Sequence, residues 1–240
     1  MDPISIALQA LKLFESGKEQ EAGRYLSNLR ELFPKSTSAL RLESFIQAQI
    51  GISPVKNYQH LLTQYPQDHL TTYLLANYLL KNKNKGEAQE VYQSYLQKIE
   101  HKSSFLPALI LISEYNKLLD NASRIPEQKL LPKDLRIVIT NLHPDPTFSL
   151  SVKDPAGHET ETNEISPTGI AVTEGFGLIE ITDRRILLGN YQLHASCERQ
   201  QLLEIATYRN FGTAEEKLSR DLILVEAGSK NQIISTITVN

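Results

Sequence analysis

The 240-residue sequence has one cysteine, no tryptophan and no excess of basic charge. The single cysteine, Cys197, excludes an internal disulfide framework and a cysteine-based zinc site. A formal net charge of -3 lacks the basic surplus of most nucleic-acid surfaces, so no nucleic-acid partner is expected. The densest apolar run, 105–112, is interrupted by Pro107 and falls well short of the ~18 residues that span a bilayer. We therefore expect no membrane insertion.

The first residues, Met1-Asp2-Pro3-Ile4, do not show the basic and then apolar regions of a secretory signal. The expected location is the cytoplasm, or an extracytoplasmic compartment if the sequence is a segment of a longer chain.

Residue usage changes near position 120. Eight of the ten tyrosines precede this position, whereas seven of the eleven glycines and eleven of the fifteen threonines follow it. Threonine favours strands and glycine supplies their turns. The shift predicts a helical domain over 1–120, a proline-containing linker over 121–133 and a β domain over 134–240.

Apolar residues in the first half recur at helical spacing and predict about seven helices of ~12–16 residues joined by short connections. Asp2-Pro3 and Ser53-Pro54 each place a capping side chain before a first-turn proline, and Asp68 is a third predicted cap.

The helical segments also repeat. Phe33-Pro34 and Tyr65-Pro66 lie 32 residues apart, and Ala22 and Ala88 lie 66 residues apart, which is two steps of 33. This step is close to 34 residues, so the segment from 3 to about 119 resembles three tetratricopeptide repeats and a final helix, although its tryptophan position is unfilled. The resemblance implies an α-solenoid with a concave groove that binds a protein segment. The candidate groove residues on the first helices of the repeats are Gln9, Lys12, Tyr73 and Asn77.

In the second half, alternation of apolar and polar residues predicts seven or eight short strands and an antiparallel β-sandwich. The predicted strands cover 135–140, 148–152, 177–182, 189–196, 202–208, 222–226 and 232–239.

Several short strings in this half occur in the order and spacing of a known family. They are Asp134–Thr140, Leu150–Gly157, Thr173–Gly177, Gly189–Tyr191 and Thr207–Thr213. Together they resemble the YfaP-type bacterial domain of unknown function, which often follows helical repeats and occurs beside VIT and von Willebrand A domains. The resemblance implies a protein of that kind as a partner. Thr147 and Ser149 stand where the family commonly carries aspartates, so we expect no metal site.

The sequence shows no constellation typical of an enzyme. The six histidines are scattered without metal-ligand spacing, and no Gly-x-Ser-x-Gly motif is present. Cys197 and His194 lie three residues apart, on opposite faces of a strand, which disfavours a nucleophile and base pair. We expect a non-enzymatic interaction adaptor without a cofactor. The alternatives are a carbohydrate- or ligand-binding module on the β domain, which exposed aromatic residues would favour, and a hydrolase.

Overall fold

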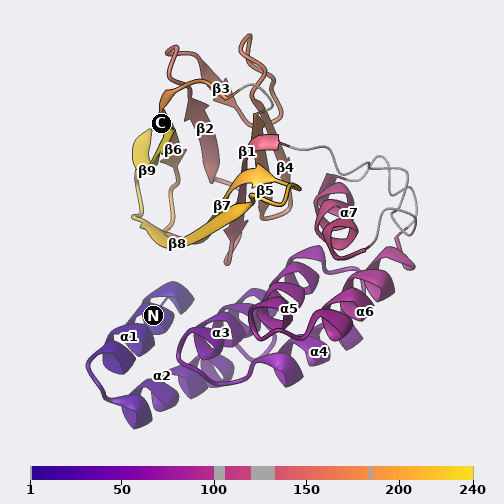
Figure 1. Cartoon of the computed structure of the whole chain (residues 1–240). Helices are drawn as coiled ribbons and strands as arrows, with labels where there is room; N and C mark the ends of the chain where they lie inside the picture. Colours follow the sequence, from indigo (N-terminus) through magenta and orange to yellow (C-terminus); the bar gives the residue numbers. More distant parts are fainter. Residues whose placement is uncertain (1, 100–105, 120–132, 184–185, 240) are drawn as a thin grey trace. The chain divides into compact units, whose positions relative to one another are not determined.

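The computed structural model describes residues 2–99, 106–119, 133–183 and 186–239 of the chain (Figure 1). In these residues seven helices are followed by two antiparallel β-sheets, which confirms the predicted order of helical and β structure. The chain divides into two compact units, residues 1–102 and residues 103–240, which we call the helical unit and the β unit. Apart from residue 133, the predicted linker lies outside the described residues.

The helical unit contains six described helices with short connections. They are α1 (Pro3–Glu15), α2 (Glu19–Leu32), α3 (Thr37–Gln49), α4 (Val55–Gln64), α5 (His69–Lys81) and α6 (Lys85–Leu96). None of the helices in the described part of the chain combines the length and the apolar character needed to cross a membrane.

Two of the three predicted helix caps are confirmed. The Asp2 carboxylate accepts a hydrogen bond from the backbone N–H of Ser5 at 3.2 Å, and the Asp68 carboxylate accepts one from that of Thr71 at 3.1 Å. The prediction for Ser53 is wrong, because Pro54 itself is the N-cap residue of α4 and no side chain caps this helix. A helix can begin without a capping side chain when packing supplies its stability.

The helices of this unit pack as consecutive pairs, α1 with α2, α3 with α4 and α5 with α6, and α3 contacts both α1 and α5. Ala22 on α2 and Ala88 on α6 are fully buried. Small side chains at these two positions allow neighbouring helices to approach closely.

The β unit contains two antiparallel sheets with strand orders β4-β5-β1-β7-β8 and β3-β2-β6-β9. We call them the five-stranded and the four-stranded sheet. Their strands are β1 (Lys133–Asn141), β2 (Ser149–Lys153), β3 (Glu159–Glu161), β4 (Ala171–Gly175), β5 (Leu178–Asp183), β6 (Gly189–Ser196), β7 (Gln201–Phe211), β8 (Lys217–Val225) and β9 (Gln232–Val239).

Three strands depart from the prediction. β3 and β4 were not predicted. β3 has only three residues, and its one buried residue, Thr160, is polar and lies between two exposed glutamates, so the sequence shows no apolar alternation there. β8 begins at Lys217, whereas the predicted strand began at Leu222. The prediction missed residues 217–222 because they are all exposed and therefore lack the alternation of buried and exposed positions. β8 is also an edge strand of its sheet.

One hydrophobic core joins the two sheets. It takes inward-facing residues such as Ile137 and Ile205 from the five-stranded sheet, and Val152 and Leu193 from the four-stranded sheet. Tyr191 is the largest side chain in this cluster, and its hydroxyl donates a hydrogen bond to Asp183 at 2.9 Å.

The seventh helix, α7 (Leu106–Leu118), belongs to the β unit, whereas the sequence grouped it with the repeats. Its Glu114 carboxylate forms an ion pair with Arg136 on β1, and Arg136 also bonds Glu180 on β5 at 2.6 Å. Arg136 is fully buried, and its guanidinium carbon lies 4.2 Å from the ring centre of Phe211. The helix is therefore anchored on the β unit by a buried charge.

Burial alone would raise the pKa of Glu114 and lower the pKa of Arg136, which favours the uncharged form of each. The pKa of Glu114 nevertheless lies below its ordinary value, because the charges of Arg136 and Lys117 outweigh the effect of burial. The pKa of Arg136 lies well above its ordinary value, since Glu114 and Glu180 likewise outweigh burial. Both groups are charged at neutral pH.

Candidate functional site

The four residues predicted to line a groove occupy two helices and differ in exposure. Gln9 and Lys12 on α1 are exposed, whereas Tyr73 on α5 has no exposed surface. Asn77 is half-buried, and its side-chain amide donates a hydrogen bond to the backbone carbonyl of Tyr73 at 2.9 Å. The structure therefore places Tyr73 and Asn77 together and leaves Gln9 and Lys12 on a separate hairpin. The assignment of these residues to a binding groove stays a prediction.

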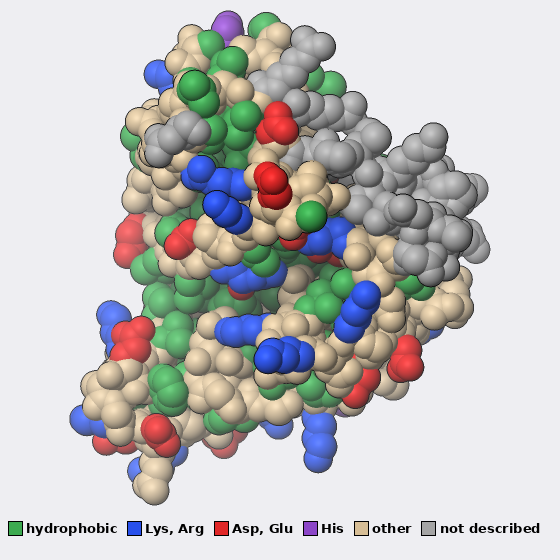
Figure 2. Space-filling view, in the orientation of Figure 1, with side chains coloured by type: hydrophobic (Ala, Val, Ile, Leu, Met, Phe, Trp, Pro, Cys, Tyr) green, Lys and Arg blue, Asp and Glu red, His purple; other side chains and the backbone are tan. Residues whose placement is uncertain are grey.

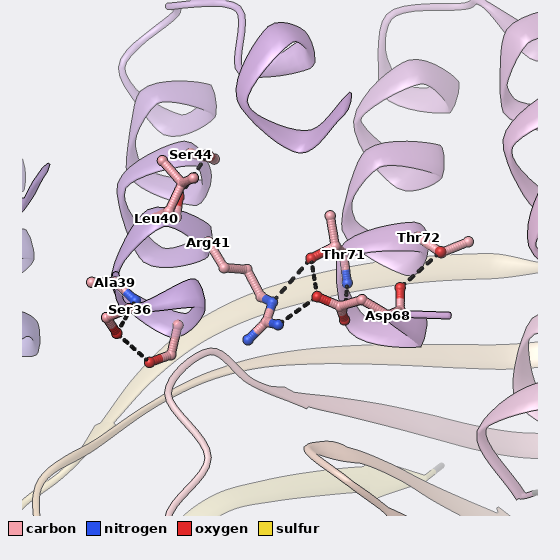
Figure 3. A network of polar contacts seen from close by, with 9 residues as sticks. Ser36, Ala39, Leu40, Arg41, Ser44, Asp68, Thr71 and Thr72 are labelled. Carbon is pink, nitrogen blue, oxygen red and sulfur yellow. Dashed lines mark hydrogen bonds and ion pairs between the residues drawn. The ribbon is translucent and has the colours of Figure 1, made fainter. Parts of the chain in front are cut away.

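A polar network joins α3 to the start of α5 (Figure 3). Arg41 reaches from α3 so that its Nη2 lies 2.6 Å from Oδ2 of Asp68, and its Nε donates to the Thr71 hydroxyl at 3.2 Å. That hydroxyl donates in turn to Asp68 at 2.6 Å. Burial raises the pKa of Asp68, but Arg41 and Thr71 more than offset this effect, so its pKa lies below the usual value. The network fixes the first turn of α5 against α3.

A second network joins α2, α3 and α4. Arg30 Nη2 lies 2.9 Å from the buried Glu43 carboxylate and donates to the Asn57 side chain at 3.2 Å. Gln47 donates to Glu43 at 3.1 Å and accepts from Asn57 at 3.0 Å. Burial raises the pKa of Glu43 despite the opposing charge of Arg30. The two networks hold successive hairpins at fixed positions.

One hollow in the helical unit lies over α4, α5 and α6, and we call it the second-helix groove. It has a volume of about 870 Å³. Leu62, Leu75, Leu79 and Val91 supply apolar side chains to its lining, and Glu87, Glu90 and Lys98 supply charged ones. None of the four predicted groove residues, Gln9, Lys12, Tyr73 and Asn77, lines it.

A smaller hollow of about 310 Å³ lies one helical hairpin earlier, and Arg30, Pro34, Leu40, Asn57 and His60 are among its lining residues. Pro34 corresponds to Pro66 and Leu40 to Thr72 at a spacing of 32 residues, and both later residues line the second-helix groove. Neighbouring hairpins thus form related hollows. The repeated Phe33-Pro34 and Tyr65-Pro66 pairs were the sequence signal for this relation.

Tyr95 adds an unusual feature to the second-helix groove that it lines. Its side chain is buried, and its hydroxyl has no hydrogen-bond partner among the described residues. Burial raises the pKa of this phenol, so the hydroxyl keeps its proton. An unsatisfied buried hydroxyl costs about 1–3 kcal/mol, and an acceptor brought by a partner would recover part of that cost.

In the β unit, the aromatic residues that were considered for ligand stacking are mostly internal. Phe148, Tyr191, Tyr208 and Phe211 are buried, and only Phe176 is exposed, in the turn between β4 and β5. The sheets therefore present no aromatic stacking platform built from these residues.

Cys197, the one candidate nucleophile considered, is buried. Its thiol donates a hydrogen bond to the backbone carbonyl of Glu226 at 3.3 Å. Burial raises its pKa, which keeps the sulfur in the unreactive thiol form.

The face of the helical unit seen in Figure 2 carries charges of both signs. In the described residues, no group of three or more histidine, cysteine or acidic side chains is arranged to hold a metal ion.

The resemblances to tetratricopeptide repeats and to the YfaP-type domain stay predictions. No family model, curated protein or solved structure was found to match this chain.

Proposed function

We propose that the protein is a non-enzymatic adaptor whose helical unit binds a segment of another protein, while its β unit offers a second surface. In this proposal the six helices form a tetratricopeptide-like solenoid, and the two sheets form a β-sandwich. The consecutive packing of the helical pairs and the core shared by both sheets support these assignments.

The observation that carries the proposal is the second-helix groove. Leucine and valine side chains combined with a charged and polar margin are typical of surfaces that accept an amphipathic segment. The related hollow between α2 and α4 extends the same chemistry along the stacked helices.

The charges favour one kind of partner segment. Glu87 and Glu90 are both exposed on α6, three residues apart, and therefore lie on one face of that helix. We expect a segment that places apolar side chains on the half-buried Leu62 and Val91 and basic side chains beside the two glutamates. A hydrogen-bond acceptor near Tyr95 would satisfy its buried hydroxyl.

The resemblance of the β unit to the YfaP-type domain supports a partner that carries a VIT or von Willebrand A domain. The first-helix residues Gln9, Lys12 and Asn77 define an alternative binding surface for the same partner.

Site-specific cross-linking tests the proposal. A photoreactive amino acid at Ser94, which lines the groove, is compared with one at Lys12, using lysate of the organism that carries the gene. Each captured protein is identified, produced separately and titrated calorimetrically against the whole chain.

Charge-reversed variants test whether the affinity measured in that titration depends on the second-helix groove. Reversing the groove charges with Glu87→Lys and Glu90→Lys should weaken binding about tenfold or more, which is about 1.4 kcal/mol. The matched control reverses two exposed glutamates of α2, Glu19→Lys and Glu31→Lys, and should leave affinity unchanged. Equal affinities of the two variants, or capture from Lys12 alone, would reject the second-helix groove as the binding site.

A further inference from the structure

The outer face of the four-stranded sheet carries a polar hollow of about 580 Å³. Leu150 and Leu193 point into the core, so their neighbours Ser149, Ser151 and His194 face the other side of the sheet. Ser151 on β2 lies directly opposite both Glu161 on β3 and His194 on β6. Three adjacent strands thus place hydroxyl, carboxylate and imidazole groups on one surface.

His194 is the least satisfied group in this hollow. Both of its ring nitrogens are shielded from solvent, yet neither has a hydrogen-bond partner among the described residues. An imidazole carries at least one N–H, and buried polar groups are normally hydrogen-bonded. The residue as a whole is only half-buried, and it lines the hollow.

The strand pairing beside His194 is also irregular. The pairing of β6 with β9 shifts between Leu193 and His194, so that Ser235 faces the first and Ile233 the second. Such bulges redirect side chains and are frequent beside functional sites. The extra residue, Ile234, belongs to β9, so the bulge lies on the strand next to the unsatisfied imidazole.

The lining offers both hydrogen-bond donors and acceptors. Ser196 accepts a bond from the backbone N–H of Asn231 at 2.8 Å, which leaves its own O–H free to donate. Ser151 donates to Glu159 at 2.6 Å, which leaves its oxygen free to accept. The imidazole of His194 would add one donor and one acceptor in its uncharged form. An ammonium group would satisfy only the acceptors and an anion only the donors, whereas a hydroxyl group satisfies both.

We propose that this hollow binds a small, uncharged, hydroxyl-rich ligand of the monosaccharide class, with His194, Ser151 and Ser196 as its hydrogen-bonding residues. Glu159 and Glu161 accept further hydrogen bonds from ligand hydroxyl groups, and their negative charge disfavours anionic ligands. Because no exposed aromatic residue lines the hollow to stack on a sugar ring, we expect hydrogen bonds alone to hold the ligand and the affinity to be weak. This site lies in the β unit and is independent of the groove in the helical unit.

Imidazole resonances of the whole chain provide the test. The six histidines are observed in long-range proton–nitrogen NMR spectra, and His194→Gln identifies the His194 signals. D-glucose, D-galactose and N-acetyl-D-glucosamine are titrated separately, with spermidine and acetate as charged probes. We expect at least one sugar to shift the His194 signals saturably, and neither charged probe to do so.

Two variants connect the response to the proposed contacts. Ser196→Ala removes the free O–H donor and should weaken the sugar response at least threefold. His158→Gln, a change at an exposed residue of the β unit that does not line the hollow, is the matched control and should leave it unchanged. Preserved backbone amide spectra establish that each variant is folded. No saturable response to any of the three sugars, an equal response in Ser196→Ala, or a response to spermidine alone would overturn the proposal.

Discussion

Arg136 retains a full positive charge at a position from which water is excluded. Its charge is balanced by Glu114 and Glu180, and aromatic rings lie against its guanidinium group. A buried ion pair is poor evidence of net stabilisation when compared with apolar replacements, but removal of one partner leaves an uncompensated buried charge. The stability of the β unit is therefore sensitive to the loss of either carboxylate partner of Arg136.

We predict that Glu114→Gln lowers the free energy of unfolding by about 3 kcal/mol, because Arg136 then loses one of its two carboxylate partners. The control is Glu216→Gln, which removes the part-exposed partner of Lys117 and should cost about 0–1 kcal/mol. Urea titrations followed by far-UV circular dichroism measure both changes. Equal losses in the two variants would contradict the assigned importance of the buried pair.

The pH dependence of the stability difference between the native chain and Glu114→Gln tests the same ion pair. Because the pKa of Glu114 is lowered in the folded state, the unfolded chain takes up this proton first as the pH falls. The stabilisation is complete well above the ordinary glutamate pKa of about 4.3, and it is lost as the pH decreases through the folded pKa. The stability difference between the native chain and Glu114→Gln should therefore narrow below about pH 4.

At the scale of elements, α7 is positioned by close packing as well as by charge. A methyl group added at Gly175, at the end of β4, would lie 2.5 Å from Cγ of Pro107 on α7. A proline ring has little freedom to move aside, so strand and helix would have to separate.

We predict that Gly175→Ala destabilises the β unit by about 1–3 kcal/mol, the usual cost of overpacking. Gly157→Ala is the control for a turn glycine, because a methyl group there meets no neighbouring atom and only its positive φ of +88° is strained. Hydrogen exchange should show faster opening of α7 amides in Gly175→Ala than in Gly157→Ala. Equal protection of α7 in both variants would exclude the Pro107 contact as a determinant of its docking.

Local patterns predicted most helices and strands but not the neighbours of α7. Asp2 and Asp68 were identified as caps because the cap and the N–H it bonds lie three residues apart. The placement of α7 depends on Glu114 meeting Arg136 across 22 residues, and one sequence contains no signal for that contact. The second-helix groove escaped prediction for the same reason, since its lining comes from three helices.

At the scale of the whole molecule, the division into residues 1–102 and 103–240 places α7 with the sheets. A boundary at 120 or 134 would separate Glu114 from Arg136 and Pro107 from Gly175. The shorter β fragment would then bury an arginine that has lost its helical partner.

We predict that a fragment of residues 103–240 folds cooperatively and that a fragment of residues 134–240 does not. The expected signs are dispersed amide resonances and a sigmoidal urea transition for the longer fragment, and poor dispersion with rapid proteolysis for the shorter one. In the 134–240 fragment, Arg136→Met removes the buried charge without removing the bulk of the side chain, so it should restore part of the lost stability. Identical stability of the two fragments would show that α7 is dispensable to the sheets, and failure of the longer fragment to fold would show that the β unit depends on residues before 103.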